Sequence, residues 1–186
     1  MEFSGKKVTV VGTGISGIGA VGLLNAVGAE VVLYDGNEKL KIEDIEKKLG
    51  TYKAEIVLGE LTKELTDSSD LLVISPGVPI DSPVVKAFEA AGVPVWGEVE
   101  LAYAFDKGKV LAITGTNGKT TTTALVGQIV GAYHKDTFVV GNIGNPYTTE
   151  VLKSNKDSYT VAEISSFQLE TVHEFHPLVS AILNIT

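Results

Sequence analysis

The residues best suited to chemistry form one short glycine-rich segment, Gly115-Thr116-Asn117-Gly118-Lys119-Thr120-Thr121. Backbone N–H groups of such a loop point at phosphate oxygens, and the dipole of a following helix favours negative charge. Lys119 can neutralise phosphate charge, and the Thr120 hydroxyl can reach Mg²⁺. The segment departs from the general P-loop spacing, because Ile113 stands where the first glycine would be. We predict that the segment binds the phosphates of a nucleoside triphosphate, ATP.

A second acidic partner for the metal is expected on a strand after this loop. Glu163 lies at the end of an apolar run that begins at Tyr159. Mg²⁺ takes oxygen ligands from one or two protein groups and from the phosphates that it bridges. We therefore predict Thr120 and Glu163 as metal ligands, and Lys119 and Glu163 as catalytic groups. A strand-end acid facing solvent is the alternative for Glu163.

Another glycine-rich turn, Gly12-Thr13-Gly14-Ile15-Ser16-Gly17, follows the first apolar run of the chain. Asp35 stands eighteen positions beyond Gly17, at the end of the next apolar run. Glycines at this spacing let a pyrophosphate approach the backbone, and the acid meets a ribose or base donor. NAD, FAD and a UDP-sugar all carry a pyrophosphate beside a ribose, so the spacing leaves these ligands open, as it does a purely structural turn.

Two further polar turns follow strand-like runs. Asn142, in Gly141-Asn142-Ile143-Gly144, offers an amide to a substrate oxygen or simply forms a turn. The turn Ser75-Pro76-Gly77 either lines the nucleotide crevice or is an ordinary turn. Both interpretations stay open on the residues alone.

The elements that must position these residues alternate between strand and helix patterns. Strands are expected at 8–11, 31–34, 55–58, 71–75, 93–96, 110–113, 138–140, 159–164 and 179–185, and helices at 16–27 (amphipathic), 42–49 and 120–132. Ser82 is expected to cap another helix that begins at Pro83 and stops at Gly92. This order predicts an α/β protein with parallel sheets and helices on their faces.

A polar stretch, Asp106-Lys107-Gly108-Lys109, indicates a linker between two units. We predict a Rossmann-like domain at residues 1–107 and a P-loop NTPase-type domain at 108–186. The sequence stops at Asn184-Ile185-Thr186, where open α/β sheets place their binding loops. We therefore expect the second domain to be incomplete and the chain to be part of a longer protein.

The amino-acid composition limits the classes of molecule that the chain is expected to bind. The chain has 186 residues, 44% of them hydrophobic, a formal charge of −8 and no cysteine. Dispersed acidic residues disfavour nucleic acid, and the lack of cysteine excludes disulfides and thiolate catalysis. The three histidines show no metal-ligand spacing, and no apolar run approaches the roughly 18 residues of a membrane span. We expect a cytoplasmic monomer that binds small molecules.

Taken together, the motifs resemble the Mur ligases, ATP-dependent amide ligases of peptidoglycan assembly in cell-wall biogenesis, and among them those that add D-glutamate. The resemblance covers essentially the whole chain. It is carried by residues 10–17, 74–78, Gly97-Glu98-Val99-Glu100-Leu101, 114–121, 141–144 and 163–170.

The resemblance implies that the first domain binds UDP-MurNAc-L-alanine instead of NAD. The residues that it implies for contact with UDP are Ile15, Ser16, Asp35, Gly36 and Gly77. Asn142 and Ser165 are implied to face the pyrophosphate and alanine end of the same substrate. Gly115 to Thr121 are implied to bind ATP, with Mg²⁺ on Thr120 and Glu163.

The implied reaction starts with attack of the L-alanine carboxylate on the γ-phosphate of ATP. The amine of D-glutamate then attacks the acyl phosphate, which yields ADP, phosphate and an amide. Family members continue beyond the Asn-Ile-Thr strand end with further metal ligands, adenine contacts and a C-terminal domain for the incoming amino acid. We therefore expect this chain alone to bind nucleotide without ligating. An NAD-dependent oxidoreductase and a non-catalytic nucleotide-binding module are the alternatives.

Overall fold

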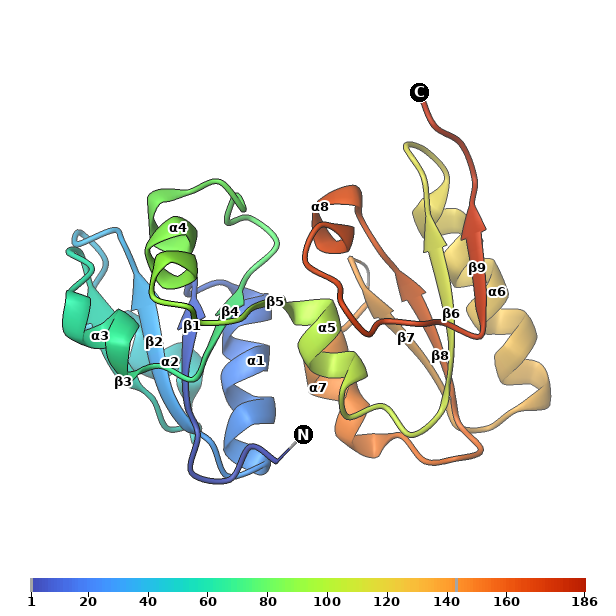
Figure 1. The fold of residues 1–186 in the computed structure, drawn as a ribbon. Helices are drawn as coiled ribbons and strands as arrows, with labels where there is room; N and C mark the ends of the chain where they lie inside the picture. Colours follow the sequence, from blue (N-terminus) through green and yellow to red (C-terminus); the bar gives the residue numbers. More distant parts are fainter. Residues whose placement is uncertain (1, 143) are drawn as a thin grey trace.

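The computed structural model describes residues 2–142 and 144–186 and contains two parallel β-sheets (Figure 1). Met1 and Ile143 lie outside the described residues. The first sheet, in the order β3-β2-β1-β4-β5, consists of β1 (Lys7–Val11), β2 (Glu30–Asp35), β3 (Glu55–Leu58), β4 (Leu71–Ile74) and β5 (Val95–Gly97). The second, in the order β7-β8-β6-β9, consists of β6 (Lys109–Thr114), β7 (Thr137–Gly141), β8 (Tyr159–Glu163) and β9 (Val179–Ile182).

The helices lie in the connections between consecutive parallel strands. They are α1 (Ile15–Ala26), α2 (Ile42–Leu49), α3 (Lys63–Ser68), α4 (Pro83–Ala90), α5 (Glu98–Tyr103), α6 (Lys119–Tyr133), α7 (Tyr147–Glu150), the 3₁₀ turn η1 (Val151–Lys153) and α8 (Ser166–Leu169). The predicted α/β class with parallel sheets is confirmed. Most predicted element bounds lie within one or two residues of the observed ones, whereas β9 ends three residues earlier than expected.

The first sheet is buried on both faces, which explains the continuous apolar runs of its strands. Val10 faces one hydrophobic core, and the next residue, Val11, faces a second core on the opposite side. Helices α1 and α2 cover the first face, and α3 and α4 contribute Leu65, Val85 and Phe88 to the second.

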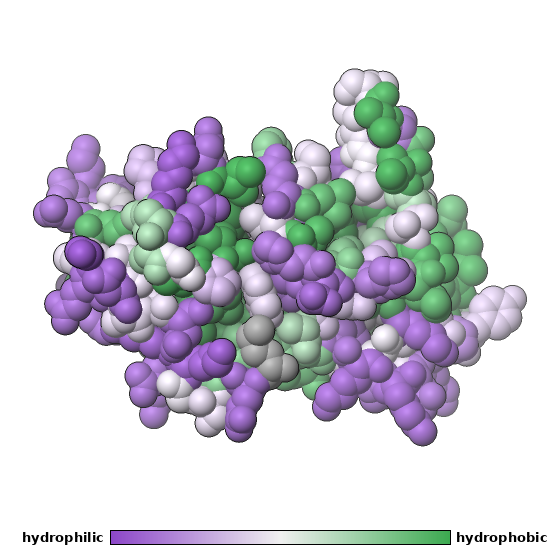
Figure 2. Space-filling model, viewed as in Figure 1, coloured by the Kyte–Doolittle hydropathy of each residue, from purple (hydrophilic) through white to green (hydrophobic). Residues whose placement is uncertain are grey.

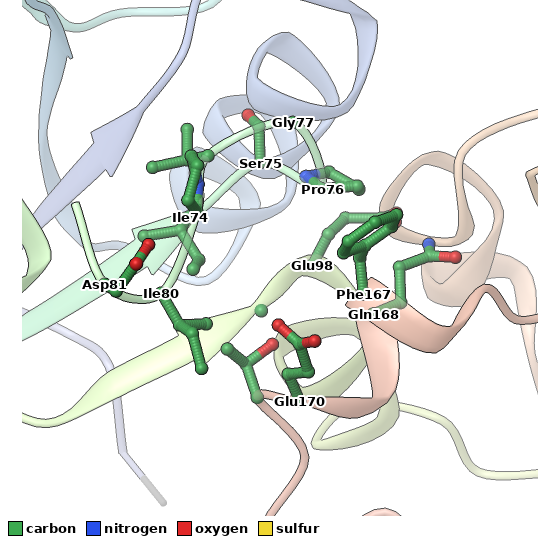
Figure 3. Close-up of a pocket in the computed structure, with 14 residues that line it drawn as sticks. Ile74, Ser75, Pro76, Gly77, Ile80, Asp81, Glu98, Phe167, Gln168 and Glu170 are labelled. Atoms are coloured by element: carbon green, nitrogen blue, oxygen red, sulfur yellow. The ribbon is translucent and has the colours of Figure 1, made fainter.

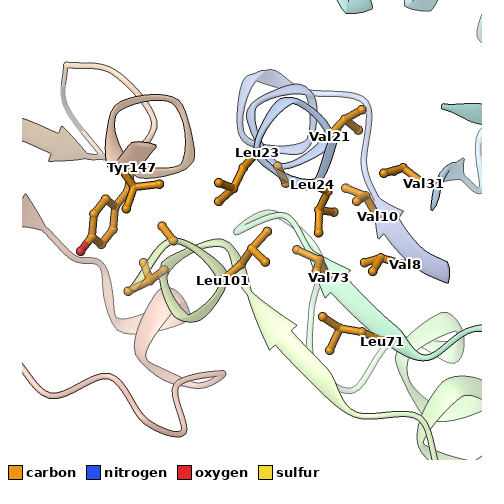
Figure 4. Packing of buried hydrophobic residues seen from close by; sticks show 14 of the residues in the cluster. Val8, Val10, Val21, Leu23, Leu24, Val31, Leu71, Val73, Leu101 and Tyr147 are labelled. Atoms are coloured by element: carbon orange, nitrogen blue, oxygen red, sulfur yellow. The ribbon is translucent and has the colours of Figure 1, made fainter. Parts of the chain in front are cut away.

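Helix α1 lies between the two halves of the molecule (Figure 1). It packs against β1 and β2 on one side and against α5 and α7 on the other. The prediction of an amphipathic helix is therefore wrong, because α1 buries more than one face. The core passes from the first sheet over Leu23 and Leu101 to Tyr147 of α7 (Figure 4). The two sheets thus share one hydrophobic core.

The predicted linker is held in place by Asp106, which is half-buried. The Asp106 carboxylate accepts hydrogen bonds from the Gly108 N–H at 2.7 Å, the Tyr147 hydroxyl at 2.6 Å and the Thr160 hydroxyl at 2.8 Å. Burial raises the pKa of the Tyr147 hydroxyl, and the nearby Asp106 carboxylate raises it further. The polar stretch therefore docks onto the second sheet before β6 begins.

Helix α4 begins at Pro83 and ends just before Gly92, as the sequence predicts. The expected cap is only partly correct. Ser82 occupies the N-cap position with an extended backbone, but its side chain makes no capping hydrogen bond. Among the residues that the structure describes, the buried Ser82 Oγ has no hydrogen-bond partner.

The second sheet ends on an exposed apolar edge. Val179 and Ile182 of β9 are 53% and 64% exposed, and Leu125 and Ile129 of α6 are both 54% exposed. Figure 2 shows hydrophobic surface on the side of the molecule where β9 and α6 lie in Figure 1. Within residues 2–142 and 144–186, the helices are all too short or too polar to span a bilayer.

Candidate nucleotide sites at the strand ends

All predicted site residues lie at the carboxyl ends of strands, where open α/β sheets bind ligands. In the first half they are Ile15 and Ser16 at the start of α1, Asp35 and Gly36 after β2, and Gly77 after β4; in the second they are Gly115 to Thr121 between β6 and α6, Asn142 after β7, Glu163 at the end of β8 and Ser165 before α8. In both halves these strand ends point to the same side, the upper side in Figure 1.

The P-loop connects β6 directly to α6, as the sequence predicts. Gly118 is the N-cap of α6 and has a φ of +81°, a left-handed conformation that favours glycine. Lys119 folds back over the loop, and its Nζ donates to the carbonyl oxygens of Gly115 at 2.7 Å and Thr116 at 3.1 Å. The lysine ammonium and the N-terminus of α6 therefore place positive charge at the same loop.

Glu163, Thr120 and Asn142 meet beside this loop. The Thr120 hydroxyl donates to Glu163 Oε2 at 3.1 Å, and the Asn142 amide lies 3.5 Å from Glu163 Oε1. The Glu163 side chain is 1% exposed, so the alternative of a solvent-facing acid is wrong. Two adjacent oxygen ligands suit Mg²⁺, which keeps several waters and takes its other ligands from phosphates. Within the described residues there is no cluster of three or more acidic, histidine or cysteine side chains that could hold a metal alone.

Asn184 was not predicted as a site residue, yet it braces the P-loop. Its backbone carbonyl accepts from the Thr116 N–H at 3.1 Å, and its side-chain Oδ1 accepts from the Asn117 N–H at 2.9 Å. Its side-chain Nδ2 donates to the Asn117 carbonyl at 3.0 Å. Asn184 follows β9, which neighbours β6 in the sheet. Its position directly after a strand was the signal in the sequence that could have identified it.

Two glycines of the first turn, Gly12 and Gly17, are required by close packing. A Cβ at Gly17 would overlap the Gly12 carbonyl oxygen, and one at Gly12 would lie 2.8 Å from Ser75 Oγ. Asp35 closes the turn from the other side, because its Oδ2 accepts from the Thr13 hydroxyl at 3.0 Å and from the Thr13 N–H at 3.3 Å. The structure therefore brings the turn, Asp35 and the loop after β4 together where the strand order reverses.

Other positions in this crevice leave room for a ligand. A Cβ built at Gly14 or at Gly77 meets nothing within 4 Å. Ile15 is 80% exposed beside them. Ser75 Oγ is buried and has no hydrogen-bond partner within the described part of the chain. An open backbone surface, an exposed apolar side chain and an unpaired hydroxyl are features that a bound nucleotide would use.

A cavity of about 600 Å³ lies between the two halves (Figure 3). The loop from Ile74 to Asp81 lines one side, and the second half lines the other with Phe167, Gln168, Glu170 and Thr171. Phe167 is 67% exposed and, in Figure 3, stands on the side of the cavity opposite Gly77. Of the predicted site residues, only Gly77 lines this cavity. The cavity therefore lies beside the candidate site of the first half and is lined in the second half by residues that follow Ser165.

Glu98 also lines this cavity and is 3% exposed. Its Oε1 accepts hydrogen bonds from the Thr148 N–H at 3.1 Å and the Thr148 hydroxyl at 3.2 Å. Burial raises the pKa of the Glu98 carboxyl, and the hydrogen bonds from Thr148, Tyr147 and Gln168 partly oppose that rise. In the sequence, Glu98 was noted only as part of a motif shared with the family. Its burial could not be predicted, because the residue type does not distinguish a buried acid from an exposed one.

The three histidines, which show no metal-ligand spacing in the sequence, are all exposed. His134 stacks on Tyr159 with ring centroids 4.2 Å apart. His173 lies 2.9 Å from the Val95 carbonyl oxygen.

Two family models match the chain. One, described as Mur ligase MurD-like, N-terminal domain, matches residues 6–97, and the other, Mur ligase middle domain, matches residues 113–186. The UDP-N-acetylmuramoylalanine--D-glutamate ligase of Lachnospira eligens is 72% identical over the whole chain, and that of Lachnoclostridium phytofermentans is 59% identical. The chain spans 41% of the length of each of these relatives.

A solved structure has the same fold. The UDP-N-acetylmuramate:L-alanyl-gamma-D-glutamyl-meso-diaminopimelate ligase from Neisseria meningitides superposes with a TM-score of 0.59 at 18% identity. The match covers 98% of the chain and 61% of that structure. The two sheets, their strand-end sites and the two family models lead to one conclusion: the chain belongs to the Mur ligase family.

Proposed function

We propose that the chain is the UDP-substrate-binding domain and part of the ATP-binding domain of a ligase that adds D-glutamate to UDP-MurNAc-L-alanine. The observation that carries this proposal is the cavity between the halves. It is lined from one side by the loop after β4 and from the other by residues just after β8. A substrate that is anchored by its UDP group in the first half can therefore extend through this cavity to the segment of the second half that follows Ser165. The relatives support the choice of D-glutamate, since they are named for it.

In this proposal, Ile15, Ser16, Asp35, Gly36 and Gly77 hold the UDP group, and Asn142 and Ser165 contact the pyrophosphate and alanine end. Gly115 to Thr121 hold ATP. The L-alanine carboxylate attacks the γ-phosphorus, the bond to the β-phosphate oxygen breaks, and ADP leaves. The amine of D-glutamate then displaces phosphate from the acyl phosphate and loses a proton. The work of this chain is to position the reactants and neutralise their charge.

Four side chains of the second half have defined roles in that work. Lys119 lies 2.7 Å from the Gly115 carbonyl oxygen and would exchange this contact for the β- and γ-phosphates. Thr120 and Glu163 supply two adjacent oxygens that would hold Mg²⁺, which neutralises phosphate charge when bound. Asn142 keeps Glu163 Oε1 oriented from the other side.

The domain boundary between residues 107 and 108 is part of the proposal. It is supported by the gap between the two family models, which falls at residues 98–112. Because the chain spans 41% of its relatives, we propose that it binds both nucleotides but does not form the amide by itself. ADP formation that depends on UDP-MurNAc-L-alanine and D-glutamate would contradict this. A cytoplasmic location and a monomeric state remain predictions.

Substitution of Lys119 tests the ATP site. We expect Lys119→Ala to weaken Mg²⁺–ATP binding at least tenfold, because a charged hydrogen bond contributes about 1.5–3 kcal/mol. Isothermal titration would measure this, with UDP as the second ligand and Lys107→Ala as the matched control, since Lys107 lies outside both sites. Unchanged ATP affinity in Lys119→Ala, or an equal loss of UDP affinity, would contradict the assignment.

A further inference from the structure

Glu98 connects the two loops that carry the proposed substrate contacts of the second half. On one side it accepts both hydrogen bonds from Thr148, at the start of α7. Helix α7 follows the segment that contains Asn142. On the other side the side chain of Gln168 in α8, which follows Ser165, lowers the pKa of Glu98 and so favours its charged form, as a nearby hydrogen-bond donor does. Glu98 and Gln168 line the same cavity (Figure 3).

The Gln168 amide is fixed in one orientation. Its Oε1 accepts from the Ser165 N–H at 2.9 Å and from the Ser165 hydroxyl at 3.0 Å. Ser165 Oγ in turn accepts from the Gln168 N–H at 3.3 Å, which completes a capping box. With Oε1 committed to Ser165, Gln168 has only its NH₂ group to offer Glu98.

We infer that Glu98 is a positioning residue for the substrate, which it serves by fixing Ser165 through Gln168 and the Asn142 loop through Thr148. This inference rests on the proposed function. Glu98 follows Gly97 at the end of β5, so it also ties both loops to the half that would hold UDP. It therefore sets the distance between the UDP site and the contacts at the far end of the substrate.

Of a carboxylate and an amide at position 98, only the carboxylate can accept hydrogen bonds on both sides. Thr148 donates twice to Glu98, and Gln168 has only its NH₂ group free to turn toward it, so the position needs an acceptor oxygen on each side. An amide at position 98 would turn its NH₂ toward one donor. If the Gln168 amide rotated to relieve this, its NH₂ group would face the Ser165 N–H, which would lose its acceptor.

The neighbouring acid provides a matched control. Glu100 is also in α5 and 1% exposed, but it accepts from the backbone N–H groups of residues 173–175, which carry no proposed substrate contact. Glu100→Gln therefore reports the general effect of neutralising a buried acid in α5.

The test compares the affinities of the 186-residue chain for UDP and for UDP-MurNAc-L-alanine by isothermal titration. We expect Glu98→Gln to weaken UDP-MurNAc-L-alanine binding about tenfold and UDP binding less than twofold, since UDP alone would reach only the first half. Glu100→Gln is expected to change neither affinity more than twofold. The double variant Glu98→Gln with Gln168→Glu restores an acceptor for each donor, and we expect it to recover most of the lost affinity.

Three outcomes would overturn the inference. They are an unchanged substrate affinity in Glu98→Gln, an equal loss of UDP affinity, and a loss of the same size in Glu100→Gln. If Glu98→Gln does not fold, the double variant is compared with Gln168→Glu alone, and equal affinities there would overturn it too. A wild-type chain that binds UDP-MurNAc-L-alanine no more tightly than UDP would instead refute the proposed function, and the inference with it.

Discussion

Glu100 offers a sharp test of how the two halves are joined. Its carboxylate lies in the shared core region and accepts from the N–H groups of His173 at 2.8 Å, Glu174 at 2.8 Å and Phe175 at 3.2 Å. These bonds fasten the segment before β9 to helix α5. Hydrogen bonds to a charged acceptor contribute about 1.5–3 kcal/mol each, and a buried donor left unpaired costs a similar amount.

Glu100→Gln keeps one acceptor oxygen, which can still serve the two N–H groups of residues 173 and 175. Its NH₂ then faces the N–H of residue 174, so one bond is lost. We expect the free energy of unfolding to fall by about 2 kcal/mol. At about 2–4 °C per kcal/mol for a chain of this size, Tm falls by about 4–8 °C.

Thermal unfolding followed by circular dichroism measures this loss. Glu100→Ala removes all three acceptor contacts, so we expect its Tm to fall at least twice as far. Glu174→Gln is the control, because that side chain is exposed and such changes usually stay within about 0.5 kcal/mol. A Tm for Glu100→Gln within 1 °C of wild type, in about the range of that control, would refute the role of this carboxylate.

Two further predictions concern Gly17 and the titration of Glu98. Gly17→Ala would push a methyl group into the Gly12 carbonyl oxygen, so we expect a loss of roughly 2 kcal/mol or more in urea unfolding, whereas Gly14→Ala, which meets nothing within 4 Å, is expected to cost less than half as much. Burial raises the pKa of the Glu98 carboxyl in the folded protein above its ordinary value of 4.5. The stability that the protonated carboxyl contributes is therefore fully present below pH 4.5 and is lost as the pH rises through the folded-state pKa. The Tm of Glu98→Gln minus that of wild type should therefore become more positive between pH 4.5 and pH 8, and a difference that stays constant or falls would contradict the raised pKa.

The strands, the long helices and the two glycine-rich turns could be predicted because their signals are local. The apolar run before Gly115 and the helix pattern after Gly118 place the P-loop without any tertiary information. The same holds for the turn after β1 and for Asp35 at the end of β2. Since parallel strands end at one edge, the sequence could also place these residues on the same side of each sheet.

The junction could not be predicted, since its acids are polar by type but buried by tertiary contact. Glu98 and Glu100 lie two residues apart in a short helix and find their partners about 50 and 73–75 residues further along the chain. The burial of α1 on two sides was missed for the same reason, because its second partner, α7, comes late in the sequence. The position of Asn184 after a strand could mark it as a site residue, but its partner, a loop 67 residues earlier, is set by tertiary contact.

The most direct test of the account is the ligand preference of the first half. The account predicts that UDP-MurNAc-L-alanine at a hundred times its Kd stabilises the chain by about 2.7 kcal/mol, a rise in Tm of about 5–11 °C. UDP should compete for the same site, and Asp35→Ala should weaken both ligands. A chain stabilised by NADH, with no response to UDP or to UDP-MurNAc-L-alanine, would contradict the account.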